Sequence, residues 1–471
     1  MCGFIFAKTK KIISDTSLES AARYVSKRGP DATGMERFQS PEFGHLLFAH
    51  FLLDISGRSV RQPLIKDGRL VLLFNGEVYN HRDISDRATD TEAILDNFAR
   101  TPDEALAAVK GEYVILVYET NKNELLIKTD TFLTKPVYLG RGDNPADVGV
   151  ASYPSALLAL GFSEITSLQP NSIYRIKFTT DTLEFQEKFP LRMFNLSQEK
   201  SGYKDWDEAF LESIRKRALH GAHKPLVCLS SGYDSGAICL ALNQLGIKYQ
   251  TISVMAGENK KILGERLRQN SKYCDNPVLL PGLTKKQREL VKRNIRTDIE
   301  RFTYRHRDSL GSLSIEDDSG AQAGYYVAQK AKEMNLRVNL SGSGADEIIS
   351  DYGFLGKKIF DHSEFGGAFP ENIDDIFPWK KFYGDTQRSY LFKEEIVWGG
   401  FGIESRYPFL DDDLVQEFLH LKYDLKNKSY KAPIAQFLEN RGYPFENGIK
   451  RGFRSRKEGL VEKLRNRWRI V

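Results

Sequence analysis

The segment Leu226–Gly246 reads LVCLSSGYDSGAICLALNQLG and decides the fold class of the second half of the chain. Its apolar start predicts a short buried strand, the small polar residues after it predict a loop, and the rest predicts a helix. The order strand, loop, helix returns at 337–349, and residues 248–257 supply another apolar strand between the two. Strands that alternate with helices predict an α/β domain built on a parallel sheet.

Two loops of this predicted sheet carry Ser, Gly and Asp directly after a strand. One contains Asp234 and the other contains Asp346. Backbone N–H groups at the start of a helix favour an anion such as phosphate, and open α/β sheets bind ligands at this edge. A carboxylate in such a loop is explained if Mg²⁺ bridges it to phosphate. The plainer alternative is a pair of glycine-rich turns in which Asp caps a helix.

The first half of the chain has a different pattern. Short apolar runs separated by turn residues predict a β-rich region up to about residue 190, with helices at 17–29 and 90–100. A polar stretch follows, and we place domains at 1–190 and 205–471 with a linker at 191–204. After the linker, apolar residues at helical spacing predict one more helix.

Composition narrows the class of protein. The chain has 471 residues, 41% hydrophobic and 28% charged, which fits a soluble globular protein of two to four domains. Four scattered cysteines without a CxxC pair argue against a disulfide framework or a zinc site. No apolar run is long enough for a bilayer and the start lacks a secretory signal pattern, so we expect a cytoplasmic protein without membrane partners.

The net charge of +5 is concentrated at the end of the chain, where residues 450–471 are strongly basic. This tail fits a solvated helix end, a polyanion or a phosphate-bearing substrate. No other part of the sequence supports nucleic-acid binding, and we expect none.

Cys2 follows the first methionine. Removal of Met1 would give one residue both a thiol nucleophile and a free α-amine that can act as its base. The alternative is a small buried residue at the start of a strand.

Several motifs resemble a known family. SSGYDSG resembles the pyrophosphate loop of ATP pyrophosphatases, and three later segments resemble motifs of asparagine synthetases: LSGSGADE, ESRYPFLDDDLV (404–415) and IKRGF (449–453). Four earlier segments occur in the order seen in class II glutamine amidotransferases: MCG, RGPDATG (28–34), FNGEVYN (74–80) and TDTEAIL (89–95). By these motifs the chain is identified as a member of the glutamine-hydrolysing asparagine synthetase family. The resemblance implies an N-terminal four-layer αββα Ntn-hydrolase domain. It also implies a parallel-sheet α/β ATP-pyrophosphatase domain with a largely helical C-terminal part.

The resemblance also implies an activity. Glutamine would be hydrolysed to ammonia, an acceptor carboxylate would be adenylated with ATP and Mg²⁺, and the ammonia, delivered through a tunnel, would form an amide. A homodimer is compatible with the family.

The catalytic residues implied by the resemblance are Cys2, Asn75, Gly76 and Lys450. Glutamine binding would use Asn75, Gly76, Glu77 and Asp90. ATP and pyrophosphate binding would use Leu229, Ser230, Ser231, Gly232, Asp234, Ser235, Val254, Ser341 and Gly342, with Asp234 and Asp346 as metal ligands and Ser343 at the acceptor. An isolated Asn75-Gly76 pair would instead predict a type I′ turn.

Three features depart from the family pattern. Leu52 stands where the family has an arginine that pairs with the glutamine carboxylate, and Arg58 or Arg61 would have to replace it. Ser343 stands where asparagine synthetases have a glutamate. Residues 301–314 are rich in Arg and His and would favour a larger anionic acceptor, or else form a solvated helix.

The acceptor therefore stays open between aspartate and another carboxylate such as a sugar acid, a peptide or a secondary-metabolite precursor. A catalytically impaired binding or regulatory relative is the remaining alternative. Cys2 argues against a β-lactam synthetase type, and a phosphoribosyl-diphosphate motif is absent from the sequence.

Overall fold

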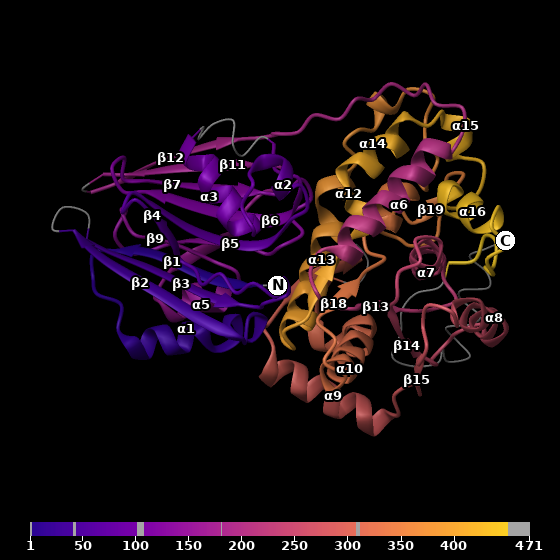
Figure 1. The fold of residues 1–471 in the computed structure, drawn as a ribbon, viewed down its shortest axis with the longest axis horizontal. Helices are drawn as coiled ribbons and strands as arrows, with labels where there is room; N and C mark the ends of the chain where they lie inside the picture. Colours follow the sequence, from indigo (N-terminus) through magenta and orange to yellow (C-terminus); the bar gives the residue numbers. More distant parts are fainter. Residues whose placement is uncertain (1, 41–43, 101–107, 180, 308–310, 451–471) are drawn as a thin grey trace. The chain divides into compact units, whose positions relative to one another are not determined.

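The structure is a computed structural model that describes residues 2–40, 44–100, 108–179, 181–307 and 311–450. The chain forms two compact units (Figure 1). Unit 1 runs to Met193 and includes Gly399–Glu404, and unit 2 comprises Phe194–Trp398 and the chain from Ser405. The basic tail lies outside the described residues beyond Lys450, so its role stays a prediction.

Unit 1 is built on two six-stranded sheets, with mostly antiparallel neighbours (Figure 1). The first sheet consists, in spatial order, of β10 (Ser163–Ser167), β8 (Tyr138–Arg141), β9 (Val148–Ala151), β1 (Gly3–Thr9), β3 (Gly44–Leu52) and β2 (Ala32–Ser40). The second consists of β12 (Leu183–Lys188), β11 (Ile173–Phe178), β7 (Glu124–Thr129), β6 (Gly111–Glu119), β5 (Leu70–Val78) and β4 (Leu64–Lys66).

Aromatic side chains join the two sheets face to face. Phe6 of β1 stacks on Phe178 of β11 at 6.3 Å, and Phe48 of β3 contacts Tyr118 of β6 at 5.8 Å. Helices α1 (Asp15–Arg28) and α5 (Pro154–Ala159) pack on the first sheet, and α2 (His81–Ile84) and α3 (Asp90–Arg100) lie on the side of the second. The predicted four-layer αββα order is therefore confirmed for unit 1.

Helix α3 shows why its sequence folds here. Ile94, Leu95 and Phe98 lie on one helical face and are buried against β5, β6 and β7. Thr89 accepts the backbone N–H of Glu92 and begins the helix. Asp90 is therefore fixed in the first turn, next to the end of β5.

The Asn75-Gly76 pair lies inside a strand. Both residues belong to β5, where Asn75 is opposite Val114 and Gly76 is opposite Tyr113 of β6. The type I′ turn alternative is thus wrong. Both residues are held by a paired strand instead.

Unit 2 contains the predicted parallel sheet. Strand β13 (Pro225–Cys228) pairs in parallel with β14 (Gln250–Val254) and with β18 (Val338–Leu340), and β14 pairs in parallel with β15 (Val278–Leu280). The fifth strand is β21 (Glu404–Arg406), next to β18. The strands predicted before the two Ser/Gly/Asp loops are present as β13 and β18, and the helices predicted after these loops are present as α7 and α11.

Most of the remaining described elements of unit 2 are helices. They are α6 (Lys204–Leu219), α7 (Tyr233–Gln244), α8 (Lys260–Asn270), α9 (Lys285–Asp298), α10 (Ser319–Glu333), α11 (Ala345–Ile349), α12 (Lys380–Tyr383), α13 (Asp385–Gly399), α14 (Asp412–His420), α15 (Tyr423–Lys426) and α16 (Ala432–Glu439). Short 3₁₀ turns lie at Ile315–Asp317, Ile373–Asp375 and Pro408–Leu410, and a two-stranded ribbon joins β19 (Gly353–Phe354) to β20 (Lys357–Lys358). In the described residues, none of the helices combines the length and the hydrophobicity that crossing a bilayer requires.

The described residues of the Arg-rich stretch at 301–314 form two strands, which corrects the solvated-helix alternative. Strands β16 (Thr303–Arg307) and β17 (Gly311–Ser314) pair in antiparallel register, with Tyr304 opposite Leu313. Alternating side chains let Tyr304 be buried while Arg305 stays exposed.

Candidate active sites

Cys2 lies directly before β1, and its backbone is fixed on both sides. Its N–H donates to Asn75 Oδ1 at 2.9 Å, and its carbonyl oxygen accepts from Arg28 Nε at 2.8 Å. Arg28 ends α1, is fully buried, and also donates to the Tyr153 hydroxyl at 2.9 Å. The side chains of β5 and α1 therefore set the position of the Cys2 main chain.

The thiol of Cys2 is buried, and the carboxylates of Glu77 and Glu404 act on it electrostatically. Burial raises its pKa to about 11, although the backbone N–H of Leu53 hydrogen-bonds the sulfur and partly opposes this. At neutral pH the sulfur carries its proton, and a thiol in this state is a weak nucleophile. Chemistry at this sulfur therefore needs a base within hydrogen-bond reach.

Asn75 contacts the main chain of Cys2, and Gly76 follows Asn75 in β5. Asn75 is fully buried, and its Nδ2 has no hydrogen-bond partner among the described residues. An unpaired buried amide costs about 1–3 kcal/mol, which suits a group that waits for a ligand oxygen. Gly76 has a φ of 133°, and a Cβ there would lie 1.9 Å from the Glu112 carbonyl oxygen. Only glycine fits this position.

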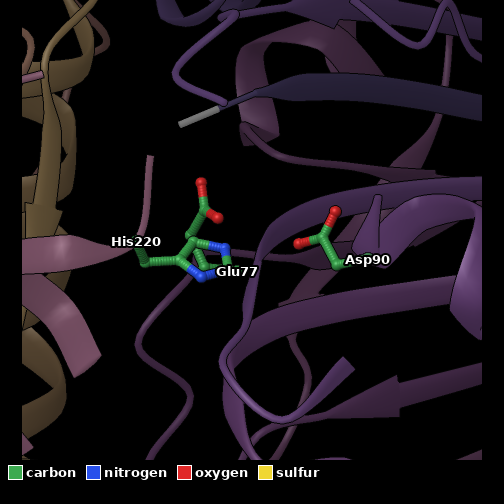
Figure 2. Close-up of side chains that lie close together, drawn as sticks. All are labelled: Glu77, Asp90 and His220. Carbon is green, nitrogen blue, oxygen red and sulfur yellow. The ribbon is translucent and has the colours of Figure 1, made fainter. Parts of the chain in front are cut away.

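Glu77 and Asp90 bring two carboxylates together at the end of β5 (Figure 2). Their oxygens lie within 4.8 Å of each other, and both side chains are half-buried. Asp90 Oδ2 accepts the Val78 N–H at 3.2 Å, which holds it at the strand end. Paired carboxylates in this place favour a cationic group such as an α-ammonium. Figure 2 also draws His220, which belongs to unit 2.

The position of the missing arginine is occupied by a core residue. Leu52 ends β3, pairs with Ala32 and is buried. Nearby, His50 lies against the Phe74 carbonyl oxygen at 3.0 Å through Nε2, and burial lowers its pKa to about 4, so the ring is neutral. Arg58 and Arg61 are both exposed. Their proposed role toward the glutamine carboxylate stays a prediction.

In unit 2 the loop between β13 and α7 is held by its own hydroxyls. The Ser230 N–H donates to Ser235 Oγ at 3.0 Å, and the Gly232 N–H donates to Ser230 Oγ at 3.1 Å. The N–H and Oγ of Ser231 both bind the Glu258 carboxylate. The loop shape is therefore fixed by side-chain contacts, as a preorganised anion site requires.

Arg266 of α8 holds the same loop through its carbonyl groups. Its Nη1 donates to the carbonyl oxygens of Ser230 and Gly232, both at 2.7 Å. A Cβ on Gly236 would lie 2.5 Å from the guanidinium, so glycine is required there. Burial lowers the pKa of Arg266. Since the N–H groups of Ser230, Ser231 and Gly232 already donate to side chains, the N–H groups suited to a ligand are those of residues 233–235 at the start of α7.

Four charged side chains meet where the two Ser/Gly/Asp loops approach. Lys431 Nζ lies 2.6 Å from Asp234 Oδ1 and 2.9 Å from Asp346 Oδ1, and Lys450 binds the other oxygen of Asp346. Burial alone would raise the pKa of Asp346, but the two ammonium groups outweigh it and lower that pKa. For Asp234, burial and Asp346 together raise the pKa. A Cβ on Gly342 would lie 2.8 Å from Asp234 Cβ, so glycine allows this approach.

The donor set fits a hard divalent cation. Two carboxylates of neighbouring loops converge, and Asp234 Oδ2 has no hydrogen-bond or ion-pair partner among the described residues. Mg²⁺ in proteins uses one or two carboxylates together with substrate phosphates. Because the two lysines already balance the two carboxylates, a cation here would need those phosphate oxygens as well.

A cavity of about 600 Å³ opens beside this cluster. The predicted site residues on its wall are Ser230, Gly232, Asp234, Ser235, Ser341, Gly342, Ser343, Asp346 and Lys450. Leu229, Val254 and Ser231 do not line it. Leu229 and Val254 are buried at the ends of β13 and β14, where only their main chains could meet a nucleotide.

The serine at position 343 faces a carboxylate from another element. Ser343 Oγ donates to Glu394 Oε2 at 2.7 Å, and Ser341 Oγ donates to the same oxygen at 2.8 Å. Glu394 belongs to α13 and lines the cavity. The wall next to Ser343 therefore keeps a carboxylate, although the sequence lacks one at that position.

Sequence reasoning found the residues that lie in motifs and missed those that support them. Arg28 lies in a quoted motif, but its contact with the Cys2 carbonyl gave no sequence signal. Lys431, Arg266 and Glu394 were missed entirely. Each is a charged residue inside a helical stretch or at its edge, and only folding brings it to a loop some 35 to 200 residues earlier.

Comparisons with known proteins give two family matches along the chain. Residues 1–186 match the glutamine amidotransferase domain family, and residues 205–395 match the asparagine synthase family. A glutamine-hydrolysing asparagine synthetase of Methanocaldococcus jannaschii is 24% identical over 84% of this chain and 73% of its own. Asparagine synthetase B of Escherichia coli is 24% identical over 83% and 69%, and asparagine synthetase 1 of Saccharomyces cerevisiae is 23% identical over 84% and 71%.

Among solved structures, a glutamine phosphoribosylpyrophosphate amidotransferase from B. subtilis covers 59% of this chain and 81% of its own. Its sequence identity is 12% and its TM-score is 0.33. A likeness of that size carries no argument about function.

Proposed function

Because the chain combines a glutamine amidotransferase domain with an asparagine synthase domain, we propose that it is a glutamine-dependent, ATP-consuming ligase that forms an amide on a carboxylate acceptor. The observation that carries the proposal is that each unit has its own preorganised site. One is the Cys2–Asn75 pair, and the other is the Asp234–Lys431–Asp346 cluster. A chain that only binds ligands would not need both.

In the first site, Cys2 attacks the side-chain amide carbon of glutamine. With Met1 removed, the Cys2 α-amine takes the thiol proton and passes it to the leaving nitrogen, which departs as ammonia. Asn75 Nδ2 and the Gly76 N–H donate to the oxygen that becomes negative, and Glu77 and Asp90 hold the α-ammonium. Water then hydrolyses the thioester to glutamate. The unpartnered Asn75 amide supports this role.

In the second site, an oxygen of the acceptor carboxylate attacks the α-phosphorus of ATP and pyrophosphate leaves. The N–H groups of residues 233–235, at the start of α7, receive phosphate oxygens, and Lys450 and Lys431 neutralise the departing charge. Mg²⁺ bound with ATP would add positive charge at the pyrophosphate, with Asp234 and Asp346 as its protein ligands. Ammonia then attacks the acyl-adenylate and AMP leaves. Glutamine and ATP are both available in the cytoplasm, where we place the reaction.

The acceptor is aspartate or a related carboxylate. With Ser343 in the loop and Glu394 on a helix, the carboxylate of this pocket has a different origin from a loop glutamate. The test therefore uses a panel of acceptors rather than aspartate alone. The test is acceptor-dependent release of pyrophosphate with ATP, across aspartate, sugar acids and short peptides, with products identified by mass spectrometry. Asparagine formed from aspartate would establish the synthetase. Failure to release either pyrophosphate or glutamate with any acceptor would overturn the proposal in favour of a non-catalytic relative.

A further inference from the structure

Glu394 is a carboxylate on the wall of the unit 2 cavity that no sequence motif marks. It extends from α13, while the residues that contact it belong to β18 and the loop that follows that strand. Ser341 and Ser343 donate to Oε2 at 2.8 and 2.7 Å, and Asn339 Nδ2 donates to Oε1 at 3.2 Å. Three donors from one segment thus fix both oxygens of a side chain that lies 51 residues away in sequence.

This arrangement has more polar contacts than packing alone would require. An ionised carboxylate in a low-dielectric wall is costly unless it is hydrogen-bonded, and here three side chains provide those bonds. The carboxylate is only partly covered, and it shares the cavity wall with Ser343, Asp346 and Lys450. It is therefore held rigidly and is still open to a ligand in the cavity.

The surroundings of Glu394 raise its affinity for a proton. Burial raises its pKa, the bonds from Ser343 and Ser341 oppose the rise, and Glu395 adds to it. Lys393 on the same helix is the nearby cation, and its ammonium is shared with Asp318 at 3.4 Å. From β13, Cys228 faces Glu394, and burial holds that thiol in its protonated form. Among these neighbours, Glu394 is a carboxylate whose raised pKa and fixed position suit it to accept a proton in the cavity.

Amide formation needs such a group. When the ammonia nitrogen attacks the acyl carbon, its lone pair forms the C–N bond and the nitrogen becomes positive. One proton must leave that nitrogen as the C–O bond to AMP breaks and AMP departs with the electron pair. Resting on the proposed function, we propose that Glu394 accepts this proton, and that Ser341 and Ser343 position its carboxylate for the transfer.

The test separates the two half-reactions. We would use the panel acceptor that gives the fastest pyrophosphate release, with ammonium chloride as the nitrogen source, and compare the wild type with Glu394→Gln. Adenylation, followed as ATP–pyrophosphate exchange, is expected to stay within about threefold. Amide formation is expected to fall about 10²- to 10⁴-fold, with little change in acceptor KM. Asp317→Asn is the matched control, since it removes a carboxylate of the same cavity wall that bonds neither serine.

A second variant gives a readout that a structural role would not move. Ser343→Ala removes one hydroxyl donor to the ionised carboxylate, so the acidic limb of the pH profile for amide formation should shift upward by about one to two pH units. Asp317→Asn should leave that limb in place. Glu394→Gln should abolish the limb altogether.

Each outcome decides between the proposals. Equal rates of amide formation in the wild type and Glu394→Gln at every pH would overturn the inference. So would a rise in acceptor KM with kcat and the pH limb unchanged, because that would make Glu394 an acceptor-binding group. A wild type that releases no pyrophosphate with any acceptor would overturn the proposed function, and the inference would fall with it.

Discussion

The groups that hydrogen-bond to Cys2 are a neutral amide, a backbone N–H and one arginine, whereas around Asp234 four charges share one small volume. The thiol site is built from Asn75, a backbone N–H and a buried arginine that binds a carbonyl oxygen. The cluster in unit 2 contains Asp234, Asp346, Lys431 and Lys450. Chemistry at the first site therefore depends on geometry, and chemistry at the second depends on charge balance. A substitution that changes shape should therefore affect the Cys2 site most, and a substitution that removes a charge should affect the Asp234 cluster most.

The largest effect is expected from Cys2→Ala, which changes shape little and removes only the nucleophile. Glutamine-dependent product and glutamate release should both fall at least about a thousandfold. Amide formation with ammonium chloride should continue, because the charge cluster of unit 2 is untouched. Glutamate assays and product mass spectrometry check both arms. Persistent glutamate release would show that another group attacks glutamine.

The next largest effect is expected from Lys431→Met, which keeps the side chain unbranched, shortens it by one atom and removes its charge. Asp234 and Asp346 would stay buried with one cation instead of two, which costs about 3–5 kcal/mol of stability. Acceptor-dependent pyrophosphate release should be lost. Thermal unfolding and a pyrophosphate assay measure the two effects.

Two further variants sharpen this contrast. Lys292→Met breaks the exposed pair with Asp317 at 2.8 Å and should cost less than about 1 kcal/mol. The double variant Lys431→Met with Asp234→Asn should regain most of the stability without regaining activity. If Lys431→Met alone were as stable as the wild type, charge balance would not govern the cluster.

Asn75→Ala tests the importance of geometry at the thiol site. Loss of one donor to the oxyanion should lower kcat for glutamate release about 10²- to 10³-fold. Asn171→Ala is the control, because Asn171 is equally buried in unit 1 and its amide donates to the Arg192 carbonyl at 2.9 Å. That variant should lose stability and keep its glutaminase kcat. Similar kcat values for the two variants would show that Asn75 does not stabilise the oxyanion.

The same contrast explains what the sequence could predict. Periodicity identified α1, α3 and the strand, loop and helix around Asp234, because these depend on neighbours close in the chain. The Asn75-Gly76 pair seemed compatible with a turn because local sequence cannot show that β6 pairs with it. Family motifs supplied the candidate residues on the loops.

Partners distant in sequence were beyond prediction. Glu394 lies in a packed helix and Lys431 directly precedes another, and nothing in the local pattern of either segment indicates a catalytic wall. Their roles arise when Glu394 of α13 meets the end of β18 and the loop after it, and when Lys431 meets the first turns of α7 and α11. The missing glutamate at position 343 suggested a lost carboxylate, while the fold brings one in from α13.

The smallest effect concerns Asp411, a charged residue of unit 2 whose role is structural. It begins α14, and it accepts Arg217 Nη1 at 2.7 Å and Lys216 Nζ at 2.8 Å. Burial would raise its pKa, but the two cations outweigh burial and lower that pKa to about 2. Because the folded-state pKa is lowered, this stabilisation is present above about pH 4 and is lost as the pH falls toward 2.

Asp411→Asn keeps the helix cap and removes the charge. At pH 7 it should cost about 2 kcal/mol and lower the unfolding temperature of unit 2 by a few degrees. Asp413→Asn is the control, since Asp413 is about half exposed and lies 3.9 Å from Lys216, so its change should be within about 0.5 kcal/mol. The difference between Asp411→Asn and the wild type should shrink as the pH is lowered from 4 toward 2. A difference that stays constant over that range would mean that Asp411 stabilises unit 2 through its shape rather than its charge, and the contrast with the Cys2 site would not extend to structural residues.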